Sequence, residues 1–170
     1  MPKRCHKNRT RIGIPPHWWG SVENIVEMGL LVMELGRIER PTIGRFIDVE
    51  FFRIIRFLPM EMLGERVDGL IYAGAKDAAA DMEVDSIDEV VTFFREKGVG
   101  KLTILSTDPL EARLDECATC SGLPSVGRPL CHFEGGLLAG FLESVLGDNI
   151  DLKEVKCWGL GDKTCLFEEI

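Results

Sequence analysis

The stretch Glu154–Ile170, EVKCWGLGDKTCLFEEI, places two cysteines on either side of a glycine-containing turn. The apolar residues around GLGD predict two strands joined as an antiparallel hairpin. If Leu160–Asp162 form the turn, Cys157 and Cys165 lie directly opposite each other, with Cβ atoms about 5 Å apart. That separation suits two thiolates on one metal ion. A disulfide and a pair of inert buried thiols are the alternatives.

Glu154 is a further candidate ligand in the same hairpin. It precedes Cys157 by three residues, and in an ideal strand this spacing puts the two side chains on opposite faces. A metal ion shared by both residues therefore requires a bulge near Val155 or Lys156.

Cys131 supplies another candidate thiolate. It follows Pro129 at the expected start of a helix, where the helix dipole favours the ionised thiol. Together with Glu154, Cys157 and Cys165 it would close a tetrahedral zinc site of the structural kind. Such a site would join the helix to the hairpin, and its binding energy would add to the folding energy.

Cys117 and Cys120 form a CxxC pair, for which several roles stay open. The pair is able to bind zinc with Cys131 and one hairpin cysteine, to bind a second metal ion, or to act as a redox pair. Two ordinary buried thiols are an equally good interpretation. Cys5, near the start of the sequence, is given no role.

Length and charge limit the classes of function. The 170 residues suit one well-packed domain. Five basic residues occupy the first 11 positions, and we interpret residues 1–16 as a flexible basic head ahead of a single domain at 17–170. The remainder is strongly acidic, which argues against nucleic acid as a partner. Neither a secretion signal nor a membrane span is expected, so we predict a cytoplasmic protein with reduced thiols.

Hydrophobic periodicity predicts helices first, then two strands, a helix and the final hairpin. Short turns join the strands, so we expect an α+β fold, a mostly antiparallel sheet with helices packed on it. The expected helices cover residues 17–28, 51–58, 64–82, 86–96 and 130–146, with Pro59 ending the second of them. The expected strands cover residues 101–107, 109–120, 149–158 and 163–170.

The segments ECATCSGLPSVGRPLCHFEGGLLAGFLESVLG (116–147) and LKEVKCWGLGDKTCLFE (152–168) resemble the 4-vinyl reductase domain family. The resemblance covers about residues 45–170 and is most specific over 116–170. This family includes the sensor domains of phenol- and toluene-responsive transcription activators, and its fold is related to that of TRAPP trafficking subunits. Aromatic-sensing members hold zinc with a cysteine, a glutamate and two further cysteines, and the matching residues here are Cys131, Glu154, Cys157 and Cys165.

The resemblance implies a zinc-stabilised, homodimeric domain that binds a hydrophobic or aromatic small molecule, a tetrapyrrole-like compound included. It would act as a carrier, a sensor or an accessory factor. The helices at 50–82 are the expected dimer interface. Gly135, Gly136 and Gly140 in the last helix indicate either a closely packed neighbour or space left for a ligand.

Two other functions remain open. The family name suggests a vinyl-reductase-type oxidoreductase, or an accessory enzyme of tetrapyrrole metabolism. The sequence offers no catalytic constellation and no nucleotide-binding motif for such a reaction. The relationship to trafficking subunits suggests a protein-interaction module instead. A filled core with a broad apolar outer surface would favour that module.

Overall fold

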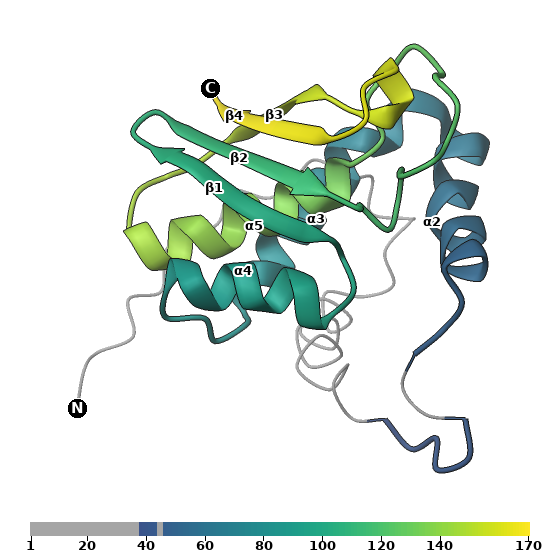
Figure 1. Cartoon of the computed structure of the whole chain (residues 1–170), viewed down its shortest axis with the longest axis horizontal. Helices are drawn as coiled ribbons and strands as arrows, with labels where there is room; N and C mark the ends of the chain where they lie inside the picture. The colour runs from purple at the N-terminus through teal and green to yellow at the C-terminus, as the bar shows by residue number, and fades with distance from the viewer. Residues whose placement is uncertain (1–37, 44–45) are drawn as a thin grey trace, which may run out of the picture. The chain divides into compact units, whose positions relative to one another are not determined.

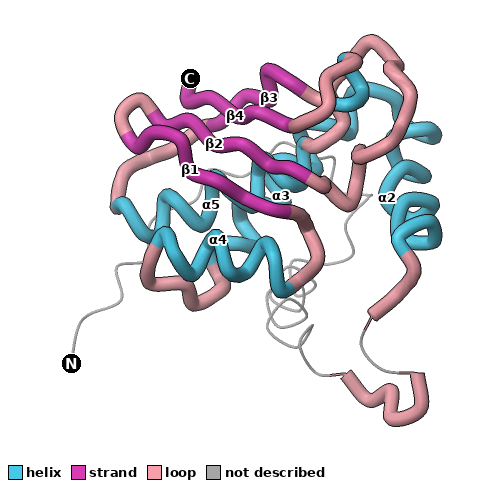
Figure 2. Tube along the Cα trace, viewed as in Figure 1, coloured by secondary structure: helices cyan, strands magenta, loops and turns pink. Residues whose placement is uncertain are grey.

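A computed structural model of the chain describes residues 38–43 and 46–170. In the described part of the chain three helices come first, followed by two strands, a further helix and two more strands (Figures 1 and 2). The helices are α2 (Val49–Leu63), α3 (Asp68–Ala80), α4 (Ile87–Glu96) and α5 (His132–Leu146), with short 3-10 helices η1 (Gly64–Val67) and η2 (Trp158–Leu160). The strands are β1 (Lys101–Thr107), β2 (Leu110–Asp115), β3 (Leu152–Lys156) and β4 (Cys165–Glu169). The predicted basic head and the predicted helix at 17–28 lie outside the described residues.

The four strands form one sheet in the order β1-β2-β4-β3, and every neighbouring pair is antiparallel. Helices α4 and α5 lie against one face of this sheet (Figure 1). The core between them is apolar, and its largest fully buried side chains include Phe94, Phe141 and Phe167. The predicted α+β class, an antiparallel sheet with packed helices, is confirmed.

Two predicted boundaries were wrong. Helix α2 continues through Pro59 to Leu63, because a proline removes one backbone hydrogen bond without ending a helix whose flanking turns are well formed. Strand β2 ends at Asp115 and does not reach Cys120. Glu116 has a positive φ of 52°, which turns the chain out of the sheet.

Helices α3 and α5 are in backbone contact. A Cβ atom on Gly136 would lie 2.1 Å from the carbonyl oxygen of Tyr72, and one on Gly140 would lie 2.3 Å from that of Lys76. No side chain fits in either gap. These two glycines therefore serve close helix packing, one of the two alternatives that the sequence left open.

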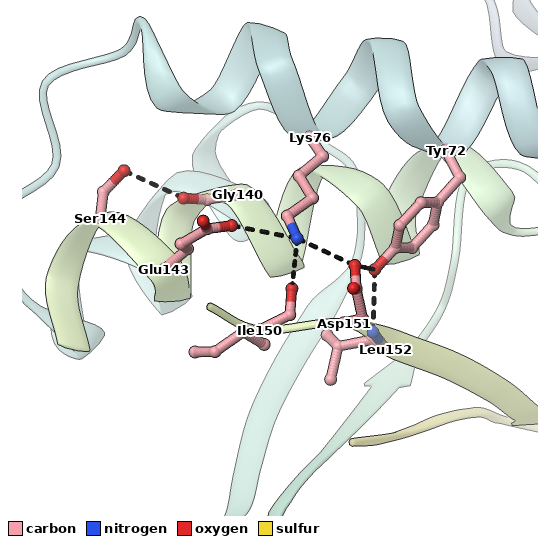
Figure 3. Close-up of polar contacts among 8 residues, drawn as sticks. All are labelled: Tyr72, Lys76, Gly140, Glu143, Ser144, Ile150, Asp151 and Leu152. Carbon is pink, nitrogen blue, oxygen red and sulfur yellow. Dashed lines mark hydrogen bonds and ion pairs between the residues drawn. The ribbon is translucent and has the colours of Figure 1, made fainter. Parts of the chain in front are cut away.

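Lys76 fixes α3 to the far end of α5 and to the start of β3 (Figure 3). Its ammonium group donates to the carbonyl oxygen of Ile150 at 2.6 Å and pairs with Asp151 at 2.9 Å and Glu143 at 3.0 Å. The hydroxyl oxygen of Tyr72 accepts the backbone N–H of Leu152 at 2.8 Å. These contacts set the position of β3 relative to α3 and α5.

Much of the exposed surface of α2 is apolar. These apolar side chains are 47–74% exposed, and they belong to Val49, Phe51, Ile54, Ile55, Leu58, Met62 and Leu63. None of the helices in the described part of the chain has the length and apolar character needed to cross a membrane.

Candidate metal centre

Five cysteine thiols and one glutamate carboxylate meet inside the domain, at the end of the sheet nearest α2 (Figure 1). Four segments supply them: the turn after β2, the start of α5, strand β3 with the turn that follows it, and the start of β4. All six residues are buried. They form two overlapping groups of four, in each of which the ligand atoms lie within 4.8 Å of one another. One group is Cys131, Glu154, Cys157 and Cys165, and the other is Cys117, Cys120, Cys131 and Cys165.

The sulfur–sulfur distances suit metal coordination better than a covalent bond. The Cys131 sulfur lies 3.6 Å from that of Cys165 and 3.9 Å from that of Cys157. Four sulfurs bound to one tetrahedral zinc at about 2.3 Å lie about 3.8 Å from one another. A disulfide requires about 2.05 Å, and the five cysteines that the structure describes are all free thiols.

Strand β3 contains the bulge that a shared site requires. Glu154 pairs with Phe167 and Lys156 pairs with Leu166, so the register shifts between these two positions. The irregularity lets Glu154 and Cys157 both face the interior, despite their spacing of three residues. The prediction of a bulge near Val155 or Lys156 is confirmed.

The predicted three-residue turn between the hairpin cysteines was wrong. The chain from Cys157 to Thr164 includes η2, and Cys165 pairs with Leu114 of β2. The reason is local: the Asp162 carboxylate accepts the N–H of Cys157 at 3.1 Å, and the Cys157 carbonyl accepts the N–H of Asp162 at 2.9 Å. The chain folds back on itself before β4 begins, and Cys157 approaches the cluster from this turn.

Only one of the two carboxylate oxygens of Glu154 has hydrogen-bond partners among the described residues. One oxygen accepts the N–H groups of Cys131 at 2.9 Å and Leu130 at 3.2 Å. The other is buried and has no hydrogen-bond partner in the described structure. Burial, with the nearby negative charge of Cys157, raises the pKa of Glu154 to about 9. A metal ion would satisfy the free oxygen and favour the ionised form, so these residues fit a cation.

The thiols cannot all ionise unaided. Hydrogen bonds from Cys120 and Cys131 lower the pKa of Cys157. Contacts with the other thiols, Cys117 first, raise the pKa values of Cys131 and Cys165 well above the usual range. At Cys131 these neighbouring thiols outweigh any effect of the helix N-terminus on the pKa. A cation bound among these sulfurs would lower the pKa values of the thiols and so favour their ionised forms.

The Cys117–Cys120 turn is held in place by α2. The Arg53 guanidinium donates to the carbonyl oxygens of Ala118 at 2.7 Å and Ser121 at 2.8 Å. The two thiols are 0–1% exposed, which argues against exchange with an external redox partner. Sequence periodicity gave no sign of Arg53, because its contacts are 65 and 68 residues away along the chain.

Glu134 is a second buried carboxyl that the sequence did not single out. One of its oxygens accepts a 2.5 Å hydrogen bond from the Thr119 hydroxyl, and the other has no partner among the residues described. Burial, with the charge of Cys117, raises the pKa of Glu134 to about 7, against an opposing effect of Arg56. The carboxyl links the CxxC turn to α5.

This carboxyl predicts a pH dependence of stability. Its pKa rises from 4.5 in the unfolded chain to about 7 in the folded one, so the unfolded state loses its proton first as the pH rises. Glu134 alone should therefore contribute a fall of about 3 kcal/mol in the free energy of unfolding between about pH 4.5 and pH 7. Urea unfolding across this range should show a flatter profile for Glu134→Gln than for the parent. The exposed Glu168→Gln variant is the control and should follow the parent; matching profiles for all three proteins would contradict the assignment.

A cavity of about 220 Å³ adjoins the candidate metal centre. Cys131 and Glu154 form part of its wall, and Tyr72 and Phe167 supply aromatic surface. Gly135 also lines it, and a Cβ atom there would lie 3.1 Å from the Phe167 ring and 3.6 Å from that of Tyr72. Of the glycines in α5, Gly135 lines the cavity, whereas Gly136 and Gly140 pack against α3.

Comparison with known proteins gives a consistent result. The model of the V4R domain family matches residues 110–169, which include all six candidate ligands. The uncharacterised protein MJ1642 of Methanocaldococcus jannaschii is 39% identical over 127 residues, which are 74% of this chain and 79% of that protein.

Two solved structures share the fold. One is a vinyl-4-reductase family protein from Methanocaldococcus jannaschii, with a TM-score of 0.58, 20% identity, and coverage of 87% of this chain and 94% of that one. The other is the phenol-responsive sensory domain of the transcription activator PoxR with phenol. Its TM-score is 0.56, its identity 14%, and its coverage 89% of this chain and 91% of that one.

Proposed function

Because this chain belongs to the V4R (4-vinyl reductase) domain family, we propose that it is a metal-stabilised domain that binds a hydrophobic or aromatic small molecule. One observation carries the proposal: the cavity and the cluster of thiols share two residues, Cys131 and Glu154. A bound ion would fix the wall of the cavity. The protein would then act as a carrier, a sensor or an accessory factor.

The proposed metal is zinc, held by the predicted group of Cys131, Glu154, Cys157 and Cys165. Three thiolates and one carboxylate are ligands that zinc accepts, and four protein ligands close a tetrahedral site with no position for a substrate. The group joins the start of α5 to both strands of the C-terminal hairpin. Its role is structural, and the reduced thiols it requires agree with the predicted cytoplasmic location.

The proposed ligand is a single-ring aromatic compound. Pockets for drug-sized ligands measure about 300–1,000 Å³, so a cavity of about 220 Å³ suits something smaller. Its size therefore favours a small aromatic over a tetrapyrrole. The rings of Tyr72 and Phe167 offer surfaces for edge or offset stacking. The phenol bound to the PoxR sensory domain is a compound of this size.

The proposal also includes a homodimer formed through α2. Seven large apolar side chains on this helix are at least 47% exposed, and burial in a partner copy would remove them from water. The helix lies within residues 50–82, the expected interface, apart from Val49. Native mass spectrometry of the intact protein distinguishes the dimer from a monomer.

Phenol is the probe that tests the cavity. Gly135→Ala places a methyl group 3.1 Å from Phe167 and should weaken phenol binding by at least about tenfold, or about 1.4 kcal/mol. Isothermal titration calorimetry measures the change. Gly74→Ala is the matched control, since nothing lies within 4 Å of its Cβ position, and it should bind phenol like the parent. Equal affinity in both variants would place the ligand elsewhere, and a parent that binds no phenol would exclude phenol as a ligand.

A further inference from the structure

The cluster holds more ligands than one tetrahedral ion uses. Six donor atoms converge, and a tetrahedral ion takes four of them. The two groups of four have two members in common, Cys131 and Cys165. We propose that the cluster binds two zinc-like cations bridged by the Cys131 and Cys165 thiolates. Cys117 and Cys120 complete the first site, and Glu154 and Cys157 complete the second.

The distances around Cys131 support a shared ligand. Its sulfur lies 3.6 Å from the Cys117 sulfur on one side and 3.9 Å from the Cys157 sulfur on the other. Both values are close to the edge of about 3.8 Å of a tetrahedral zinc–thiolate site. The Cys131–Cys165 separation of 3.6 Å is then the edge that the two tetrahedra share.

Cys165 also belongs to both groups. Its sulfur lies 3.2 Å from that of Cys120, a member of the first site, and within 4.8 Å of the ligand atoms of Glu154 and Cys157 in the second. It also starts β4, between β2 and β3 in the sheet. Cys131 and Cys165 therefore belong to both groups, and the remaining two ligands of each group come from different parts of the chain.

Each terminal pair has a separate support. Arg53 and backbone hydrogen bonds from Ser121 and Leu123 to the carbonyls of Cys117 and Cys120, both 3.0 Å, hold the first pair. The bulge in β3 presents Glu154. The Gly159 N–H donates to the Cys157 sulfur at 3.4 Å, a contact that stabilises a thiolate.

A single ion leaves part of the cluster without a role. Bound by the four cysteines, it leaves a Glu154 oxygen buried and unpartnered. Bound by the group that contains Glu154, it leaves Cys117 and Cys120 as uncoordinated thiols beside a cation. Two ions use all six ligands. They also offset four of the six negative charges, which leaves the same residual charge as one ion bound by three thiolates and a carboxylate.

This proposal rests on the metal site of the proposed function. The number of ions bound by the intact chain distinguishes the two-ion cluster from the single zinc site. The full protein, loaded with zinc and studied by native mass spectrometry, should retain two ions per chain. One ion per chain would overturn the bridged pair and leave the single site standing. A chain that binds none would overturn both.

Cadmium-113 tests the bridge in the parent protein, so no variant has to fold. The spectrum should show two resonances coupled to each other through the shared sulfurs. Two uncoupled resonances, or one, would overturn it. Single substitutions then assign the sites: Cys120→Ser and Cys157→Ser should each retain one ion. A variant that still retains two would overturn the assignment of that ligand.

Discussion

Replacing Cys165 with serine is expected to release all bound metal and to unfold the C-terminal part of the domain. Cys165 belongs to both ligand groups, so neither can be completed without it. Structural zinc contributes about 10–16 kcal/mol of apparent binding energy, whereas a whole domain is stable by about 5–15 kcal/mol. The loss is therefore comparable to the total stability. Metal analysis by mass spectrometry and thermal melting followed by circular dichroism measure the two effects.

Two controls make this result specific. Cys5→Ser changes a cysteine of the predicted basic head and should leave metal content and melting unchanged. Prolonged treatment of the parent with a strong chelator should reproduce the unfolding of Cys165→Ser, because it removes the same ion without changing a side chain. If Cys165→Ser keeps its metal and melts like the parent, Cys165 is not a ligand and both four-residue groups are wrongly assigned.

Gly136→Ala is expected to cost at least about 3 kcal/mol of unfolding free energy, near the upper end for overpacking. The new methyl carbon would lie 2.1 Å from the carbonyl oxygen of Tyr72. A backbone atom cannot rotate away, so α3 and α5 must separate, and the Lys76 contacts between them must lengthen. At about 2–4 °C per kcal/mol for a chain of this size, the melting temperature should fall by roughly 6–12 °C. Urea unfolding gives the free energy directly.

Gly74→Ala, the control for phenol binding, also serves here. It is the same substitution in the interior of α3, and its Cβ would meet nothing within 4 Å. Alanine is a better helix former than glycine by about 1 kcal/mol, so this variant should be as stable as the parent or slightly more stable. Equal losses in the two variants would mean that the helices do not pack as closely as the structure shows.

Local patterns in the sequence predicted much of the architecture. The change from helical to alternating periodicity placed β1 and the start of β2, and the expected helix at 86–96 matches α4. The spacing of Glu154 and Cys157 even required the bulge that β3 contains. These features depend on residues that are neighbours in the chain, so their spacing is informative.

Other features depend on contacts between distant residues. Arg53 and Glu134 contribute to the candidate site only because α2 and α5 both reach the turn after β2. The connection from Cys157 to Cys165 depends on hydrogen bonds of Asp162, which spacing alone does not reveal. Gly136 and Gly140 serve close packing, one of the two functions weighed for the glycines of α5, and only the approach of α3 in the folded chain reveals it.

The shared wall between cavity and thiol cluster has a thermodynamic consequence. Cys131 and Glu154 belong to both, so under the proposed function the binding of an ion and the binding of a small molecule would be linked. Such coupling is reciprocal. If the bound ion changes the affinity for the small molecule by some factor, the small molecule changes the affinity for the ion by the same factor. If the chain holds an ion and a ligand as proposed, removing the ion should change the affinity for the ligand.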